Sequence, residues 1–118
     1  MTEEVKIPEL LAANFNAEVT NPNNKYTLVF FYTSWCRPCR TMEEVLVGLY
    51  RICHERVQFW KFDQDTVTHP VDYRETIASP LPTSIPTLRL YCDGQMKKEM
   101  VGLHSLGAVY DWLMDNLS

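Results

Sequence analysis

The chain has 118 residues, a length that fits one domain of ordinary size, which we place at residues 1–118. Hydrophobic residues make up 46% of it and charged residues 22%, which excludes a disordered tail, a fibrous repeat and a small disulfide-dense scaffold. The net charge of −4 disfavours a broad nucleic-acid-binding surface, and no apolar run approaches the roughly 20 residues of a membrane span.

Helix and strand patterns alternate in the first half of the chain. Residues 9–19 have a weak helical pattern, and residues 21–24 form a turn-like Asn-Pro-Asn-Asn segment. Residues 26–32 are β-branched and aromatic with almost no polarity, which is typical of a strand buried on both faces. Apolar side chains at helical spacing predict a helix over residues 40–55, and residues 57–63 predict the next strand.

The second half predicts a short helix at residues 71–78, then a hairpin and a last helix. Strand patterns at 87–92 and 97–101 flank an Asp-Gly pair that favours a tight hairpin turn. Residues 106–117 carry an apolar face at helical spacing, and Ser105 can cap the first free N–H groups of this helix. Together the patterns predict an α/β fold, with a central mixed β-sheet flanked by helices on both faces in three α/β/α layers.

Two cysteines near the start of the helix predicted at 40–55 carry the strongest chemical signal. Cys36 and Cys39 are separated by Arg37 and Pro38 and follow a buried strand. At this spacing the two sulfurs can close a disulfide with little backbone change. The partial positive charge and free N–H groups of a helix N-terminus favour a thiolate. We therefore expect Cys36 to be exposed and to ionise readily, and Cys39 to be more buried.

Two other interpretations of this cysteine pair remain open. The same spacing occurs in zinc sites, and cysteines also pack simply as small apolar side chains. A zinc site would need two further ligands, for which Cys53, His54 and Cys92 are the candidates. Cys53 falls on the apolar face of its own helix, and Cys92 ends a strand far along the chain. Simple packing does not account for the adjacent Trp35 or for Arg37 and Arg40 at a polar helix start.

Four segments, in order along the chain, resemble segments of the thioredoxin family. Residues 31–39 (FYTSWCRPC) resemble its active-site segment, and residues 84–88 resemble the segment that carries a cis-proline. Residues 93–94 resemble its hairpin turn, and residues 101–103 with the helix that follows resemble its C-terminal pattern. The resemblance covers nearly the whole chain, is weakest before residue 26, and implies the thioredoxin fold.

The resemblance implies a thiol–disulfide oxidoreductase that reduces protein disulfides. Cys36 would be the attacking thiol and Cys39 the resolving thiol, and the pair would cycle between a dithiol and a redox-active Cys36–Cys39 disulfide. The dithiol carries the electrons, so no cofactor and no metal are expected. A cis peptide bond is implied between Ile85 and Pro86. The implied substrate-binding groove is made of Trp35, Arg37, Pro38, Ile85, Pro86, Gly102 and Leu103.

The resemblance also implies the partners. They are disulfide-containing protein substrates and an electron donor of the thioredoxin-reductase type, and we expect a monomer that binds neither nucleic acid nor membranes. Residues 1–5 lack the basic and apolar regions of a secretory signal, so we expect a cytoplasmic protein. Two alternative functions stay open: a thioredoxin-like binding or adaptor module with low turnover, and a disulfide oxidase or isomerase.

Several positions depart from the family pattern. Many members have a buried Asp where this chain has Phe30, and our alignment places Phe59 where those members have a Lys that partners this Asp. Two aromatic side chains would then replace a buried charge pair, which is consistent because one lone buried charge is costly. Lys61 lies two residues further on and is not expected to take the place of that Lys. Glu44 replaces a helix-kinking proline, and Arg37 replaces a glycine.

Overall fold

The computed structural model describes residues 5–67 and 80–117. Its α-helices are α1 (Phe15–Val19), α2 (Arg37–Cys53) and α4 (Leu106–Asn116). Its strands are β1 (Tyr26–Tyr32), β2 (Gln58–Asp63), β3 (Thr87–Cys92) and β4 (Gln95–Val101). Short 3₁₀ turns lie at Ala12–Asn14, before α1, and at Gln64–Thr66, after β2. The helix predicted at residues 71–78 lies outside the described residues.

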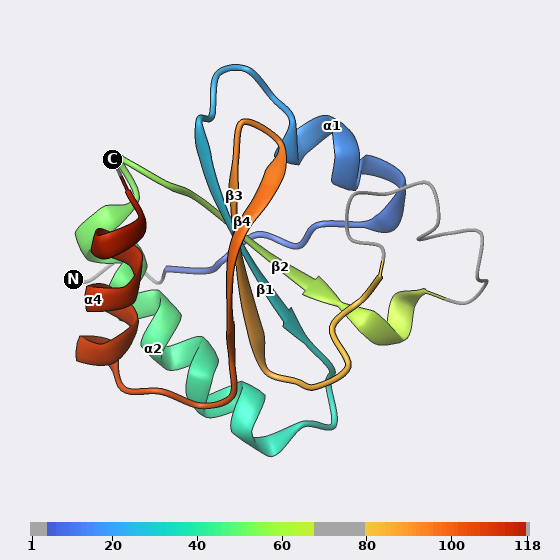
Figure 1. Cartoon of the computed structure of the whole chain (residues 1–118). Coiled ribbons are helices and arrows are strands. Elements are labelled where there is room, and N and C mark those ends of the chain that lie inside the picture. The colour runs from blue at the N-terminus through green and yellow to red at the C-terminus, as the bar shows by residue number, and fades with distance from the viewer. Residues whose placement is uncertain (1–4, 68–79, 118) are drawn as a thin grey trace.

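The strands form one mixed sheet in the order β2-β1-β3-β4 (Figure 1). β1 runs parallel to β2 and antiparallel to β3, and β3 and β4 form an antiparallel hairpin. The hairpin turns at Asp93 and Gly94, which have φ angles of 52° and 83°. A tight hairpin turn with positive φ at both central positions favours Asp-Gly, so this pair sets the turn. The predicted hairpin and mixed sheet are confirmed.

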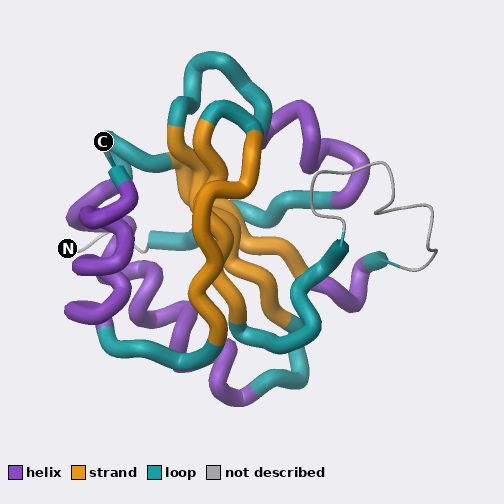
Figure 2. The backbone as a smooth tube through the Cα atoms, in the orientation of Figure 1, coloured by secondary structure: helices purple, strands orange, loops and turns teal. Residues whose placement is uncertain are grey.

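Helices cover both faces of this sheet, which lies in the middle of the molecule (Figures 1 and 2). On one face, α2 and α4 bury a core in which Phe30, Leu46 and Leu113 are at most 1% exposed. On the other face, the Phe15 side chain of α1 packs with Phe31 in a second buried cluster. β1 contributes to both clusters because its successive side chains point to opposite faces. The predicted three-layer α/β/α arrangement is confirmed.

The segment before α1 corrects a prediction. A helix was expected over residues 9–19, but only Phe15–Val19 is α-helical. Glu9 instead forms a parallel bridge with Lys61 of β2, and Lys61 donates its backbone N–H to the Pro8 carbonyl at 2.9 Å. Pairing with a strand distant in the sequence holds this segment extended. The spacing of apolar residues within the segment could not predict this pairing, because its partner strand is distant in the sequence.

Three segments from different parts of the chain meet at one end of the sheet. In the strand register, Phe31 near the end of β1 lies opposite Thr87 at the start of β3. Thr87 in turn lies opposite Val101 at the end of β4. The chain segments that continue from these positions lead into α2, back to Pro86, and on to α4. The sheet therefore gathers the predicted functional segments at this end (Figure 1).

Candidate functional site

The predicted cysteine pair lies at the start of α2 and is disulfide-bonded. Cys36 is the N-cap of the helix, with an extended backbone, and its Sγ accepts a hydrogen bond from the Cys39 N–H at 3.2 Å. The two Cα atoms are 5.2 Å apart. Pro38 stands in the first turn, where its missing N–H removes no helical hydrogen bond. The same four residues, 36–39, therefore begin the helix and form the disulfide.

The exposure of Cys36 differs from the expectation. Its relative exposure is 5%, against 2% for Cys39, so both residues are buried in the disulfide-bonded form that the structure holds. The Cys36 sulfur is bonded to Cys39 and faces the first turn of α2, which withdraws it from solvent. The predicted order of exposure is therefore retained, but the predicted open thiol is wrong for this redox form.

The predicted groove residues lie in the segments that meet beside this disulfide. The peptide bond between Ile85 and Pro86 is cis, and the Gly102 N–H donates to the Pro86 carbonyl at 2.8 Å. This hydrogen bond joins the segment before β3 to the segment after β4. Trp35 is 69% exposed and Leu103 is 48% exposed, whereas Pro86 is buried.

This end of the molecule therefore presents apolar side chains to solvent around the disulfide. Single exposed apolar residues are ordinary, but several that converge on one reactive group indicate a surface for a polypeptide. Gly102 has a φ of 94°, a conformation that suits glycine and leaves the backbone bare at this point. Contact of the groove residues with a substrate stays a prediction.

The layer beneath the disulfide is apolar, and its strand register corrects our alignment. Phe30 is 0% exposed and belongs to the same buried cluster as Cys39. Its partner across the parallel β1–β2 pair is Lys61, whereas Phe59 lies opposite Leu28. Residues in register share a face of the sheet, so Lys61 and not Phe59 is the neighbour of Phe30. Phe59 is nevertheless buried, as expected, at 1% exposure.

A charged cluster at the edge of this layer was not foreseen. The Lys61 Nζ lies 3.3 Å from the Glu43 Oε2 and 3.7 Å from the Glu9 Oε1, and 5.5 Å from the centre of the Tyr32 ring. The Tyr32 hydroxyl donates to the Glu9 carboxylate. Burial, followed by this hydrogen bond, raises the pKa of Tyr32 above its usual value. Glu43 lies one helical turn after Cys39, which was the available sequence signal.

The other two cysteines lie apart from the disulfide. Both are free thiols: Cys53 is buried in the core under α2, and Cys92 is half-buried at the end of β3. Within residues 5–67 and 80–117, no three His, Cys, Asp or Glu side chains are grouped so that they could hold a metal ion. In the same residues, no helix has the length and apolarity needed to cross a membrane.

Comparisons with known proteins agree with this geometry. The family model for thioredoxin matches residues 6–115. The chain is 35% identical over 103 residues to a thioredoxin of Mycobacterium tuberculosis, covering 87% of this chain and 83% of that protein. It is 34% identical to a bifunctional thioredoxin reductase/thioredoxin of Mycobacterium leprae, over 91% of this chain and 22% of that protein. The crystal structure of oxidized mitochondrial thioredoxin 3 from Saccharomyces cerevisiae matches with a TM-score of 0.73 at 26% identity, over 92% and 94% of the two chains.

Proposed function

Because the chain belongs to the thioredoxin family, we propose that its Cys36–Cys39 pair delivers two electrons to disulfides of protein substrates. The protein is a thiol–disulfide oxidoreductase of the protein-disulfide reductase type. The observation that carries the assignment to this pair is the disulfide at the start of α2, with the Cys39 N–H directed at the Cys36 sulfur. An adaptor with low turnover and an oxidase or isomerase are less favoured, because the matched relatives bear the name thioredoxin.

The chemistry follows from the positions of the two sulfurs. In the reduced protein, the Cys36 thiolate attacks one sulfur of the substrate disulfide and forms a mixed disulfide, releasing the first substrate thiolate. The helix N-terminus and the Cys39 N–H favour the thiolate form of Cys36. Cys39 then gives up its proton and attacks the Cys36 sulfur, which releases the second substrate sulfur. The products are the Cys36–Cys39 disulfide and a reduced substrate.

A partner must return two electrons to this disulfide after each cycle. The Mycobacterium leprae relative is named as a fusion of thioredoxin reductase with thioredoxin, which supports a reductase as the partner. We infer that a separate reductase of this type reduces the Cys36–Cys39 disulfide through thiol–disulfide exchange. The exposed Trp35 and Leu103 offer apolar surface to both partners, since both must bring a sulfur to Cys36.

The roles of the two cysteines are tested with single substitutions. Cys39→Ser leaves the attacking thiol and removes the resolving one, so it should accumulate a mixed disulfide with substrate. Cys36→Ser should accumulate none, and both variants should lose insulin-disulfide reduction by at least about 100-fold, because the residues act as a unit. Mass spectrometry of the trapped species measures the outcome. A mixed disulfide on Cys39 in the Cys36→Ser variant, at the rate of the Cys39→Ser variant, would reverse the assignment.

A further inference from the structure

The segments around the disulfide have a charge opposite to that of the chain. The chain has 15 Asp and Glu against 11 Lys and Arg, a net charge of −4. Yet residues 33–40, 80–87 and 101–106, which meet at this end of the sheet, contain Arg37, Arg40 and His104 and no Asp or Glu. An acidic protein thus surrounds its reactive disulfide with segments that carry only basic ionisable side chains.

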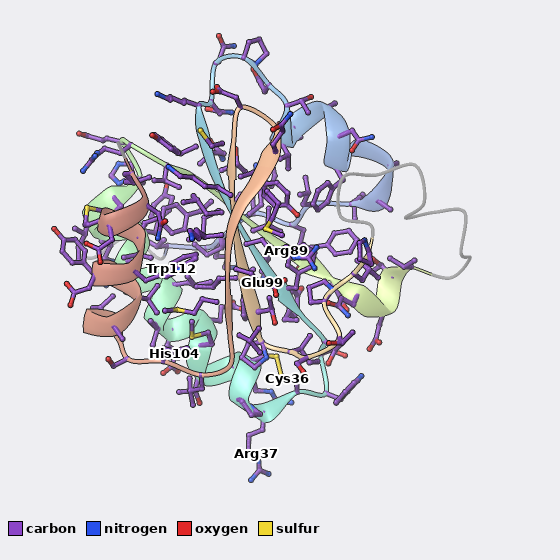
Figure 3. All side chains as sticks on the ribbon, viewed as in Figure 1. Cys36, Arg37, Arg89, Glu99, His104 and Trp112 are labelled. Atoms are coloured by element: carbon purple, nitrogen blue, oxygen red, sulfur yellow. A yellow bond between two sulfur atoms is a disulfide. The ribbon has the colours of Figure 1, made fainter. Side chains whose placement is uncertain are left out.

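Two arginines form what we call the cationic rim, Arg37 and Arg40. Both are exposed, and the Arg37 side chain, next to Cys36, is directed away from the fold into solvent (Figure 3). The Arg40 Nη2 donates to the Ser34 carbonyl at 3.5 Å, which keeps this guanidinium beside the segment that leads into α2. Among the ion pairs of residues 5–67 and 80–117, none includes either arginine.

Two of the carboxylates on the neighbouring elements have partners of their own. Glu43, on the next turn of α2, is paired with Lys61. Asp63, at the end of β2, accepts the backbone N–H of Asp65 at 3.0 Å. The His104 ring is hydrogen-bonded to the Val101 carbonyl at 2.9 Å, so it belongs to the backbone arrangement after β4. Glu44 is an exposed carboxylate one helical turn after Arg40 and lines the same surface hollow. The exposed guanidinium of Arg37, the residue next to Cys36 in the chain, is therefore the charge most available to a substrate at Cys36.

We propose that the preferred substrates are protein disulfides with Asp or Glu beside the reacting cysteine, held by the cationic rim. This inference rests on the proposed function and names the chemistry of its substrates. A guanidinium presents a fork of N–H donors that matches a carboxylate, and opposite charges also speed encounter. Each exposed pair should change the rate of mixed-disulfide formation by roughly two- to five-fold, the range of exposed ion pairs.

The cationic rim and the net charge predict opposite orders of rate for acidic and basic substrates. With a net charge of −4, the chain as a whole attracts basic peptides and repels acidic ones. The cationic rim predicts the reverse order at Cys36. A preference for acidic substrates can therefore not come from the net charge, and it should weaken as added salt screens the exposed charges.

The experiment uses three synthetic peptides closed by the same disulfide and flanked by Glu, Gln or Lys. The fully reduced protein is mixed with each peptide at low salt, and the rate of peptide reduction is measured by stopped flow. We expect the order Glu, then Gln, then Lys, with the Glu-to-Lys rate ratio at least about five. The paired variant Arg37→Gln/Arg40→Gln should lower this ratio toward one. The ratio is the readout because a change in Cys36 ionisation affects all three peptides alike.

Arg51→Gln is the matched control for the loss of charge. Arg51 is exposed on the last turn of α2, at the opposite end of the helix from Cys36, and its loss should leave the Glu-to-Lys ratio unchanged. Equal rates for the Glu and Lys peptides at low salt would overturn the inference and leave the proposed function standing. An Arg51→Gln effect as large as that of the paired Arg37→Gln/Arg40→Gln variant would also overturn it. Reduction of none of the peptides, nor of insulin, would overturn the proposed function itself.

Discussion

Phe30 is one of the positions at which we expected this chain to depart from the pattern of its family. It is fully buried in the same core cluster as Cys39, lies opposite Lys61 in the register, and stacks on Tyr32 with ring centres 5.4 Å apart. The layer under the disulfide is therefore apolar at its centre. Charge returns only at its edge, where the Lys61 ammonium lies between two carboxylates.

The substitution Phe30→Asp should lower the free energy of unfolding by a few kcal/mol at pH 7, because it removes a buried ring and buries a carboxylate. Burial raises the folded-state pKa of such an Asp above its unfolded value. Its charge-related loss of stability should therefore be absent below about pH 4 and grow as pH rises. It should also speed resolution of the mixed disulfide by Cys39, since a proton acceptor then lies nearby. Urea melts at pH 4 and pH 7 and stopped-flow resolution rates measure both effects.

Phe30→Asn is the control for this experiment, because the Asn side chain has nearly the same size as that of Asp and never ionises. The excess loss of stability of Phe30→Asp over Phe30→Asn at pH 7 isolates the buried charge. Pairing of the new carboxylate with Lys61 across the strand would reduce that excess. Unchanged stability in both variants would mean that Phe30 does not lie beneath the disulfide.

At the scale of elements, Arg89 links parts of the molecule that are distant in sequence. This β3 residue is 7% exposed, and its Nε donates to the Glu99 Oε2 of β4 at 2.7 Å. Its Nη1 donates to the Pro80 carbonyl at 3.0 Å, and its guanidinium lies 5.1 Å from the centre of the Phe31 ring. One side chain thus ties two strands to the segment that leads to the cis-proline.

Substituting Arg89 or Glu99 alone should lower the free energy of unfolding by more than half of the loss in the double variant, because each single change leaves the other charged group without this ion pair. Glu99→Gln and Arg89→Met should each lower the free energy of unfolding by roughly 1–3 kcal/mol, the range for hydrogen bonds to charged groups. The double variant should lose less than the sum, with a coupling of at least about 0.5 kcal/mol. Urea denaturation of the four proteins measures the cycle. Lys98→Gln is the control, because Lys98 is exposed and precedes Glu99 in β4, and it should change the free energy of unfolding by less than about 0.5 kcal/mol. If the effects of Arg89→Met and Glu99→Gln simply add in the double variant, the linking role of Arg89 is contradicted.

Local patterns in the sequence predicted most of the elements, because their information lies within each segment. The apolar β-branched run at 26–32 and the Asp-Gly turn after Cys92 predicted β1 and the hairpin, although β4 begins at Gln95, two residues before the predicted strand at 97–101. Ser105 caps α4 as predicted, accepting the Ala108 N–H at 3.2 Å. The helix predicted over residues 40–55 was found, but α2 begins at Arg37 and ends at Cys53. Its predicted position directly after the cysteine pair was therefore about three residues late, because the pair itself lies in the first turn.

What the sequence did not predict depends on pairing between distant segments. The bridge from Glu9 to Lys61, and the placement of Lys61 opposite Phe30, are properties of strand register. A shift of two residues preserves which face a side chain occupies, so both Phe59 and Lys61 were compatible with the local pattern. The burial of Arg89 was missed for the same reason, because its partners come from β4 and from Pro80.

A thiol and a phenol that stay protonated near neutral pH lie in the cores on the two faces of the sheet. Cys53 belongs to the core under α2 and α4, and Tyr91 belongs to the core under α1. Burial is the main cause that raises the pKa of both groups, and it raises the pKa of Tyr32 as well. Each folded-state pKa therefore lies above the value in the unfolded chain, where a thiol ionises near 8.5 and a phenol near 10.

The sign of the resulting pH dependence is fixed. Stability from these groups is fully present below their unfolded pKa values and is lost as pH rises, because only the unfolded chain gains from ionising them. The free energy of unfolding of the disulfide-bonded protein should hold near pH 7–8 and fall above about pH 9, by up to about 1.4 kcal/mol per pH unit for each group. The stability of Cys53→Ala should fall less steeply than that of the wild type between pH 8 and 10, because this variant lacks the buried thiol. Urea melts across this range measure the slopes, and a Cys53→Ala slope as steep as that of the wild type would show that ionisation of this core thiol does not oppose folding.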